Sequence, residues 1–545
     1  MTQKTIKYRH MKKIFKYIGL PVLAAGLLWS CENLDVPITT QLTPDVFPQN
    51  SAQYIQTSGA VYAAFRGDLA FSWWNSQSLT TDESIMPARA GNWFDNRAYA
   101  CQHYHDWTAD NGVGPWDWAE KVIGTSNQTI AILDKTMPSG AEKSTMISEL
   151  KTMRAISYFM MMDSYGGVPL DTVYGEFSSK SRASRVEVFN FIEKELKKAI
   201  PNLNPASGIT TYGRPNKQTA NAMLAKLYLN AEVYTGTQRY NDCVAACDAV
   251  INSGLYAIEP RASYLQMFYP NNGPQMKEFI FAVPFDPSAA TVGYNGQMYH
   301  SRYDVPRSER AKFGLAFTPS APRSTLASFY AYFNDANDIR NKQWLTGLQF
   351  MNDGVTPVMV TTTKKGYDQF YTGADGGATY TYQVNLTPDI VLRQNPALFD
   401  CGNDEIAWNM GYRNIKFYPD ASSTSRNQNN DVPFLRYSDV ILMKAEAILR
   451  GGNATLGQTA LSLVNMVRSN RSTSAAWTAV TLDDLYKERS REFAWEAWHR
   501  NDMIRFGKYE GQWGFKTNSE TYRRIFPIPT YAKALNPNLG QNPGY

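Results

Sequence analysis

The sequence predicts a mainly α-helical protein, in which a loop-rich region with short β-strands packs on a scaffold of helical hairpins. Two observations predict this class. Apolar residues recur with helical periodicity in the first half of the chain and again near its end. Between them, residues 256–431 are rich in Pro, Gly, Asn and aromatic residues, and their apolar runs are short.

The N-terminus has the pattern of a lipoprotein signal peptide, residues 1–30. Six basic residues and no acid precede Glu32, and the apolar run Tyr17–Trp29 is too short to span a bilayer as a helix. Leu28-Trp29-Ser30-Cys31 resembles the bacterial lipobox, which predicts lipidation at Cys31 and a tether over 31–50. An ordinary signal peptide with an incidental cysteine is the alternative. Either Met1 or Met11 could be the true start.

The charge balance argues against nucleic-acid binding, which the high pI of the full chain would otherwise suggest. The chain has 54 Lys+Arg and 49 Asp+Glu, but six of the basic residues lie in the predicted signal, which leaves 48 against 49. The mature protein is therefore almost neutral. No later segment is long and apolar enough to span a membrane.

Helices are predicted in both halves of a single body, residues 51–545. The scaffold comprises 51–255 and 432–510, the loop-rich insert 256–431 and the tail 511–545. Thr481 and Asp484 form a box-like helix start, and Gly451-Gly452 ends the preceding helix. Paired helices with short turns resemble tetratricopeptide-like hairpins, without a strict repeat. The predicted helices are 50–66, 115–135, 142–164, 185–200, 216–234, 238–253, 437–470 and 481–506; the predicted strands are 279–283, 358–361 and 379–382.

Composition favours a surface that binds sugars. Tyr, Phe and Trp make up 13% of the chain, and flat rings with a polar edge can stack on pyranose faces, although most of them must form the core. The remaining cysteines, Cys101, Cys243, Cys247 and Cys401, are expected to be buried thiols.

Motifs spread over nearly the whole mature chain resemble those of SusD/RagB-family outer-membrane lipoproteins. They are Met153–Phe159 with Tyr165–Leu170, Gly213–Pro215 with Ala225–Leu229, Val432–Val440 with Ala445–Ala447, Glu488–Arg505, and the ending Phe526–Pro529 with Gln541–Tyr545. One departure is visible: where the family usually has Gly and Arg shortly after the position of Glu496, this chain has Ala497 and His499.

This resemblance implies a lipid-anchored glycan-binding protein facing the cell exterior. It also implies a partner, a SusC-like TonB-dependent transporter over which the lipoprotein acts as a lid. The family motifs are expected to be scaffold rather than catalytic. Arg436 and Asp439 are expected to pair with nearby helices, and Glu496 with Arg500 as an i,i+4 pair.

The ligand site is predicted in segment 71–118 together with the middle of the chain. A sugar site needs a flat ring and planar polar groups that reach adjacent hydroxyls in pairs. The alternative is that the tryptophans fill the core and the acids cap helices. The predicted glycan-binding residues are Asp82, Arg89, Trp93, Asp95, Asn96, Tyr294, Tyr299 and Trp344, with Tyr380 and Tyr382 as weaker candidates.

No cofactor or metal site is predicted. His103, His105 and Asp106 could bind zinc, but no further histidine-rich segment supports such a site. Calcium held by Asp and backbone oxygens stays open. There is no phosphate loop, dinucleotide fingerprint or nucleophile elbow.

Three functions compete. The first is non-catalytic glycan capture for uptake. The second is a glycoside hydrolase, for which Asp82 or Glu83 with Asp95 is the only loop-borne carboxylate pair. The third is a lipoprotein that captures peptides or serves only as a structural lid. Convergence of Trp93, Tyr294 and Trp344 on one exposed face would separate the first from the third.

Overall fold

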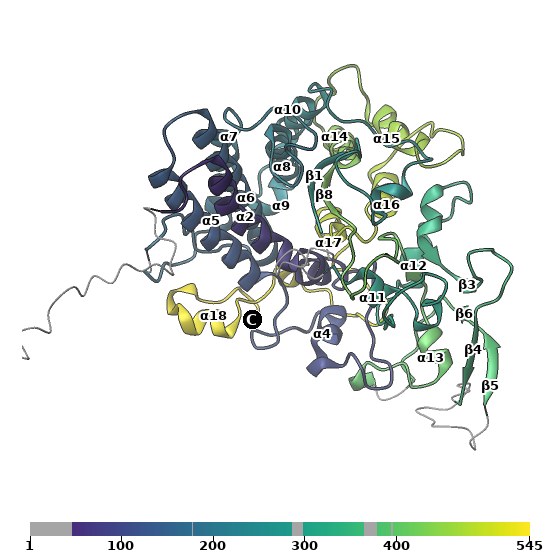
Figure 1. The fold of residues 1–545 in the computed structure, drawn as a ribbon. Helices are drawn as coiled ribbons and strands as arrows, with labels where there is room; N and C mark the ends of the chain where they lie inside the picture. The colour runs from purple at the N-terminus through teal and green to yellow at the C-terminus, as the bar shows by residue number, and fades with distance from the viewer. Residues whose placement is uncertain (1–45, 177, 286–297, 364–378, 394–395) are drawn as a thin grey trace, which may run out of the picture. The chain divides into compact units, whose positions relative to one another are not determined.

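In the computed structural model the described residues are 46–176, 178–285, 298–363, 379–393 and 396–545 (Figure 1). Residues 50–545 form one compact unit, and the following account concerns that unit. Cys31 and Tyr294 lie outside the described residues. Among the described helices, none combines the length and the apolar character needed to cross a bilayer.

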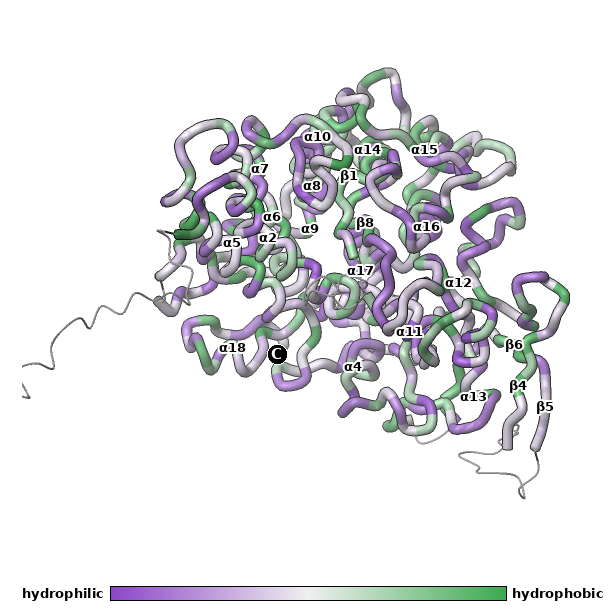
Figure 2. Tube along the Cα trace, in the orientation of Figure 1, coloured by the Kyte–Doolittle hydropathy of each residue, from purple (hydrophilic) through white to green (hydrophobic). Residues whose placement is uncertain are grey.

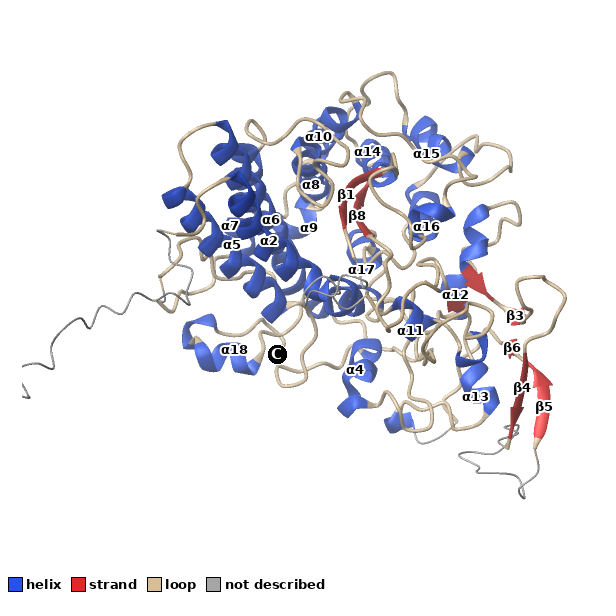
Figure 3. Cartoon of the chain, in the orientation of Figure 1, coloured by secondary structure: helices blue, strands red, loops and turns tan. Residues whose placement is uncertain are grey.

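The first half of the unit is a stack of paired helices, as predicted (Figure 3). Helix α2 continues through a π-helical turn into α3, which extends it well beyond the predicted end at residue 66. Helix α6 packs against both α5 and α7, and α8 against α10, so sequence neighbours form hairpins. These helices are α2 (Ser51–Asp68), α3 (Trp74–Ser78), α5 (Trp116–Thr136), α6 (Ala141–Tyr165), α7 (Arg185–Ala199), α8 (Lys217–Leu229), α9 (Ala231–Thr235) and α10 (Tyr240–Ile251).

The C-terminal helices complete the scaffold, since α14 packs against α8, α10, α15 and α16. Thr481 caps α16 and forms a capping box with Asp484, as predicted. Two predicted helices were too long: 216–234 divides at Asn230, and 481–506 divides between Phe493 and Trp498. The helical stretch 437–470 divides at the Gly451-Gly452 turn, where the end of a helix was predicted. The segments are α14 (Tyr437–Leu449), α15 (Ala460–Ser469), α16 (Leu482–Glu492), α17 (His499–Arg505) and α18 (Thr530–Leu535).

The strands form four antiparallel pairs of two strands each within the described residues. Strand β1 pairs with β8 and so joins the end of the first helical region to the start of the second. The predicted strands at 358–361 and 379–382 pair as β4 and β5. The pairs are β1 (Phe279–Val283) with β8 (Val432–Arg436), β2 (Trp344–Leu345) with β7 (Arg413–Asn414), β3 (Gly347–Leu348) with β6 (Asn385–Leu386), and β4 (Met359–Thr362) with β5 (Tyr380–Gln383).

The buried apolar side chains form one large core and several smaller ones. The main core joins the helical hairpins to β1 and β8, and Figure 2 shows apolar residues concentrated along β1 and α14. The loop-rich region has its own small core, which includes Val305, Leu345 and Val384. Further short helices are α4 (Ala98–Tyr104), α11 (His300–Asp304), α12 (Ala327–Tyr330) and α13 (Glu405–Asn409). The mainly helical fold with a loop-rich, strand-containing region is thus confirmed.

A buried network of ion pairs connects these parts. Arg436 lies 2.9 Å from Glu492, and Arg471 and Arg340 approach the same carboxylate at 2.9 and 3.1 Å. Asp439 pairs with Lys226 and Arg489. The family motif residues Arg436 and Asp439 are therefore scaffold, as expected.

The predicted pair of Glu496 with Arg500 is wrong. Glu496 lies 2.5 Å from Lys416, whereas Arg500 lies 3.1 Å from Asp163. The helix is interrupted before residue 499, so the two residues are not one turn apart on one helical face.

Candidate functional site

The loop 88–97 is fixed to the body by backbone and side-chain hydrogen bonds. The Ala88 amide donates to Phe399 at 2.8 Å, and the Gly91 amide donates to the Asp400 carboxylate at 2.8 Å. Arg89 is fully buried and donates to the carbonyl oxygens of Pro322, Ala407 and Met410 at 2.6–3.0 Å. The loop is therefore rigidly attached to α13 and to segment 321–324.

The backbone of this loop is strained at several non-glycine residues. Trp93, Asp95, Asn96 and Arg97 have φ values of 71°, 42°, 51° and 66°. Residues with side chains rarely adopt positive φ, and such strain persists only where surrounding contacts hold it. Clusters of this kind occur preferentially at binding sites, which makes the loop a candidate.

Trp93 belongs to an aromatic cluster with Tyr299 and Tyr303. The Trp93 and Tyr303 rings lie nearly perpendicular with centroids 5.3 Å apart, and Tyr299 and Tyr303 are 5.9 Å apart. Phe71 stacks on Tyr303 at 5.7 Å. The Arg302 guanidinium lies 5.1–5.9 Å from the centroids of the Trp93, Tyr299 and Tyr303 rings. Trp93 and Tyr299 are half-buried, so parts of their rings face solvent.

Polar groups flank this cluster. Asp95 and Asn96 are exposed, and Asp95 accepts a hydrogen bond from the Tyr99 hydroxyl. Burial first, and then the neighbouring Tyr303 and Asp95, raise the pKa of Tyr99 to about 12, so it remains a donor. The site thus combines rings, a guanidinium, a carboxylate and an amide, which suits neutral polyhydroxylated ligands.

The structure contradicts three of the predicted ligand contacts. The N–H groups of Arg89 donate to the carbonyl oxygens that anchor the loop, so they are not available to a ligand. Asp82 is buried, with its carboxylate 2.7 Å from Nε2 of His499. Trp344 is 7% exposed and packs 5.5 Å from Trp495, so it is core. Trp93 and Trp344 therefore do not converge on one exposed face.

The carboxylates proposed for hydrolysis do not face each other across a cleft. Glu83 is fully buried, accepts the Trp495 amide at 2.7 Å, and has a pKa raised mainly by burial. Asp82 is engaged by His499, while Asp95 lies on the exposed loop. A pair of carboxylates about 5–10 Å apart around a substrate needs both to be accessible.

The two histidines of the considered zinc site have separate partners. Nε2 of His103 accepts the Phe515 amide at 3.0 Å, and Nε2 of His105 lies 2.9 Å from the Thr80 carbonyl. Burial lowers the pKa of His103 to about 3, so its ring is neutral. Across the described ranges no three His, Cys, Asp or Glu residues come together as a metal site. Calcium elsewhere stays an open prediction.

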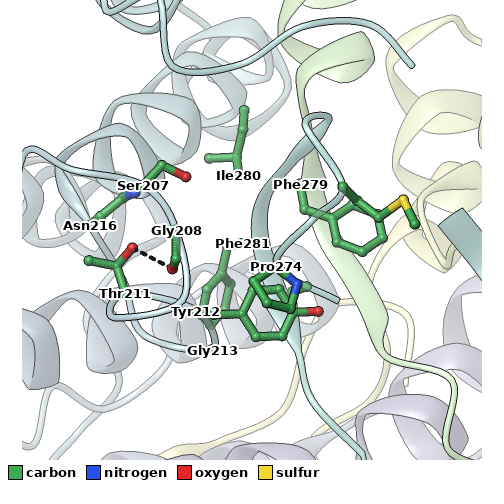
Figure 4. Close-up of a pocket in the computed structure, with 12 residues that line it drawn as sticks. Ser207, Gly208, Thr211, Tyr212, Gly213, Asn216, Pro274, Phe279, Ile280 and Phe281 are labelled. Atoms are coloured by element: carbon green, nitrogen blue, oxygen red, sulfur yellow. Dashed lines mark hydrogen bonds between the residues drawn. The ribbon is translucent and has the colours of Figure 1, made fainter. Parts of the chain in front are cut away.

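A further cavity lies between the 207–216 loop and strand β1 (Figure 4). Tyr212, Gly213, Phe279 and Phe281 contribute to its lining, and its volume is about 20 Å³. This is room for about one water molecule, so the cavity is too small for an organic ligand.

Comparison with known proteins identifies the family. The model of the SusD family matches residues 222–545, more than half of the chain, and a model described as starch-binding, associating with outer membrane, matches residues 45–229. The chain belongs to the SusD family. It is 22% identical, over 99% of its length and 100% of the relative, to the starch-binding protein SusD of Bacteroides thetaiotaomicron. A SusD-like protein of Bacteroides ovatus is 26% identical over 80% of this chain and 76% of the relative.

Solved structures agree with the fold. A laminarin-binding SusD-like protein superposes with a TM-score of 0.69 at 19% identity, over 91% of this chain and 100% of the other. Surface glycan-binding protein A from Bacteroides thetaiotaomicron, in complex with laminarihexaose, gives 0.66 at 17% identity, over 90% and 99%.

The departures of this SusD-family chain from the family pattern have structural counterparts. Ala497 has φ 62°, a conformation that a glycine adopts without strain. His499 replaces the usual arginine and pairs with Asp82. Although burial opposes it, the Asp82 carboxylate raises the pKa of His499. His499 thus forms a buried pair with Asp82.

Sequence reasoning missed Phe71, Tyr99, Arg302 and Tyr303 of this candidate site. Tyr299 and Tyr303 are four residues apart, a spacing that would have placed both rings on one side of a short helix. No sequence signal indicates that Phe71 or Tyr99 approaches them.

Proposed function

We propose that this chain is a non-catalytic, surface-exposed lipoprotein that captures oligo- or polysaccharide and delivers it to a SusC-like TonB-dependent transporter. The observation that carries the proposal is the aromatic cluster of half-buried Trp93 and Tyr299 with buried Tyr303, which lies with Arg302 beside a strained and anchored loop.

The chemistry of the cluster fits a saccharide. Exposed parts of the Trp93 and Tyr299 rings can cover C–H faces of pyranose rings. Asp95 and Asn96 offer an acceptor and an amide for neighbouring hydroxyls. Because the loop is anchored before binding, little ordering entropy is lost on capture. An affinity on the order of micromolar to millimolar would suit subsequent release to a transporter.

The related proteins support the ligand class and the location. One relative is named as starch-binding, one solved structure contains laminarihexaose, and one family model describes association with the outer membrane. The lipid at Cys31 and the transporter partner rest on the sequence pattern and the family resemblance. The absence of catalysis is supported by the burial of Asp82 and Glu83.

A binding screen with the soluble protein lacking residues 1–31 tests the proposal. Starch, laminarin, xylan, galactomannan, pectin and mucin glycans are immobilised or titrated, and at least one should bind. Trp93→Ala should weaken that binding by one to two decades, since a stacked aromatic ring contributes roughly 1–3 kcal/mol. Unaltered affinity of the Trp93→Ala variant would show that Trp93 does not contact the glycan.

Trp477→Ala is the matched control. Trp477 is also half-buried with an arginine over its ring, Arg468 at 3.9 Å, but it lies in the 471–480 segment. Its replacement should leave glycan affinity unchanged. Prolonged incubation of the wild type with the bound polysaccharide should release no new reducing ends; turnover would favour the hydrolase function instead.

Cys31→Ala tests the anchor. Because acyl chains hold a protein at a membrane by burying many CH₂ groups, the variant should lose lipid labelling and outer-membrane fractionation. Retention of both would contradict lipidation at Cys31.

A further inference from the structure

Two clefts lie beside the β4–β5 hairpin. Their volumes are about 440 Å³ and 570 Å³, and Glu405 and Asn409 of α13 line both. Strand β4 lines the first and β5 the second. Ala321 lines the first cleft, and its amide donates to the Arg302 carbonyl at 3.2 Å, so this cleft adjoins the aromatic cluster. Volumes of several hundred Å³ suit small ligands, unlike the water-sized cavity near Tyr212.

Glu405 and Asn409 form a wall common to both clefts. Tyr382 extends this wall in the second cleft, and Arg307 and Trp408 extend it in the first. Oη of Tyr382 donates to Oε2 of Glu405 at 3.1 Å and accepts from Nδ2 of Asn409 at 3.3 Å. Nη2 of Arg307 lies 3.3 Å from Oε1 of Glu405. The Arg307 guanidinium also lies 4.1 Å from the centre of the Trp408 ring. These contacts fix five side chains relative to one another before any ligand binds.

The composition of the wall selects the ligand class. The charges of Arg307 and Glu405 offset each other, so neither an anion nor a cation is preferred. Thr361 lines the first cleft and Thr381 the second, and their hydroxyls lie 2.8 Å apart across the hairpin. A half-buried indole beside a carboxylate, an amide and a phenol matches a neutral sugar, which has a C–H face and paired hydroxyls.

We propose that the α13–hairpin wall, centred on Trp408, Glu405 and Tyr382, is a second saccharide-binding site. Its ligand class rests on the proposed function, but its position does not. Arg89 connects the two sites, because it binds the carbonyls of Ala407 and Met410 from the loop that carries Trp93. A polysaccharide long enough to reach both would engage them together, and avidity would exceed the affinity of either site.

The test uses the mature chain, the six polysaccharides of the screen and hexasaccharides of the same linkages. Trp408→Ala and Arg307→Ala remove the indole and its partner; the Arg307 side chain is 41% exposed, so that variant should fold. Arg426→Ala, an exposed arginine that lines neither cleft, is the control. Melting curves verify folding of each variant.

Calorimetry with the hexasaccharide should give two bound molecules per wild-type chain and one for Trp93→Ala. Trp408→Ala and Arg307→Ala should each lower polysaccharide affinity about tenfold or more, and Trp93→Ala combined with Arg307→Ala should abolish it. Wild-type affinity in both hairpin variants, with all binding lost in Trp93→Ala, would overturn the second site alone. A wild type that binds none of the probes would overturn the proposed function and this site with it.

Discussion

Arg89 shows how one side chain determines the geometry of the candidate loop without touching a ligand. Its guanidinium satisfies three backbone carbonyls that are otherwise sealed from water. Arg89→Ala should therefore lower the free energy of unfolding by about 3–5 kcal/mol, since each buried acceptor left unpaired costs roughly 1–3 kcal/mol. Urea denaturation measures this loss.

Arg97→Ala in the same loop is the comparison. Its pair with Asp106 has side chains 43% and 40% exposed, so its removal should cost less than about 1 kcal/mol. If the two variants were equally stable and only Arg89→Ala lost glycan binding, Arg89 would be a ligand-binding residue and not an anchor of the loop.

For single residues, the sequence indicates which side chains could bind a sugar, but it does not indicate which of them are buried. Trp93 and Trp344 both lie in non-periodic sequence, and neither position signals which ring is covered. The difference arises from long-range packing: Trp344 meets Trp495, which is distant in the chain, while Trp93 stands on a strained loop. Asp95 and Asn96 are exposed and Tyr299 is half-buried, so their glycan contacts stay predictions.

At the scale of elements, the turn after α14 carries a residue that does not suit its backbone. Leu456 and Gly457 both have positive φ, 54° and 65°, and the Gln458 amide bonds the Thr455 carbonyl at 3.0 Å. Positive φ at both central residues is typical of a type I′ turn, where Asn-Gly is favoured. Leu456→Asn should therefore be more stable than Leu456→Ala by about 0.5–1 kcal/mol, because both lose the leucine contacts but asparagine tolerates this conformation better.

Thermal or urea unfolding of the two variants checks this turn. Leu456→Gly provides a third point and should also exceed Leu456→Ala, since glycine has no penalty at positive φ in the folded state. An alanine variant as stable as the other two would show that the turn is not strained at this position.

The elements themselves were largely predictable, because amphipathic periodicity and caps are local signals. Thr481 with Asp484 set the start of α16 as expected. The break after α16 was not predicted, because Trp495 and Ala497 adopt positive φ without being glycines. Tertiary contacts impose that conformation; the Trp495 amide, for example, is held by Glu83.

At the scale of the whole unit, buried charges join segments that are far apart in sequence. Glu488 is fully buried between Arg340 at 2.8 Å and Arg491 at 2.7 Å, and Glu492 of the same helix meets three arginines. The family motifs mark several of these residues, but the sequence alone does not pair them. Removing one partner of such a buried pair leaves an uncompensated charge and typically costs about 3–5 kcal/mol.

This network predicts a loss of stability in acid. Although burial opposes it, Arg340 and Arg491 lower the pKa of Glu488 to about 2, whereas an unfolded glutamate titrates near about 4.3. Its contribution to the free energy of unfolding, on the order of 3 kcal/mol, is therefore present above about pH 4.3 and is lost as the pH falls toward 2.

Urea unfolding between pH 7 and 3 should show stability falling below about pH 5. The Glu488→Gln variant should be less stable than the wild type at pH 7, and its stability should decline less steeply in acid. Asp483→Asn is the comparison: hydrogen bonds from Lys487 and Lys508 lower the pKa of Asp483, but its side chain is 50% exposed, so this variant should flatten the decline less than Glu488→Gln does. A wild-type slope in Glu488→Gln would mean that Glu488 does not take up a proton on unfolding.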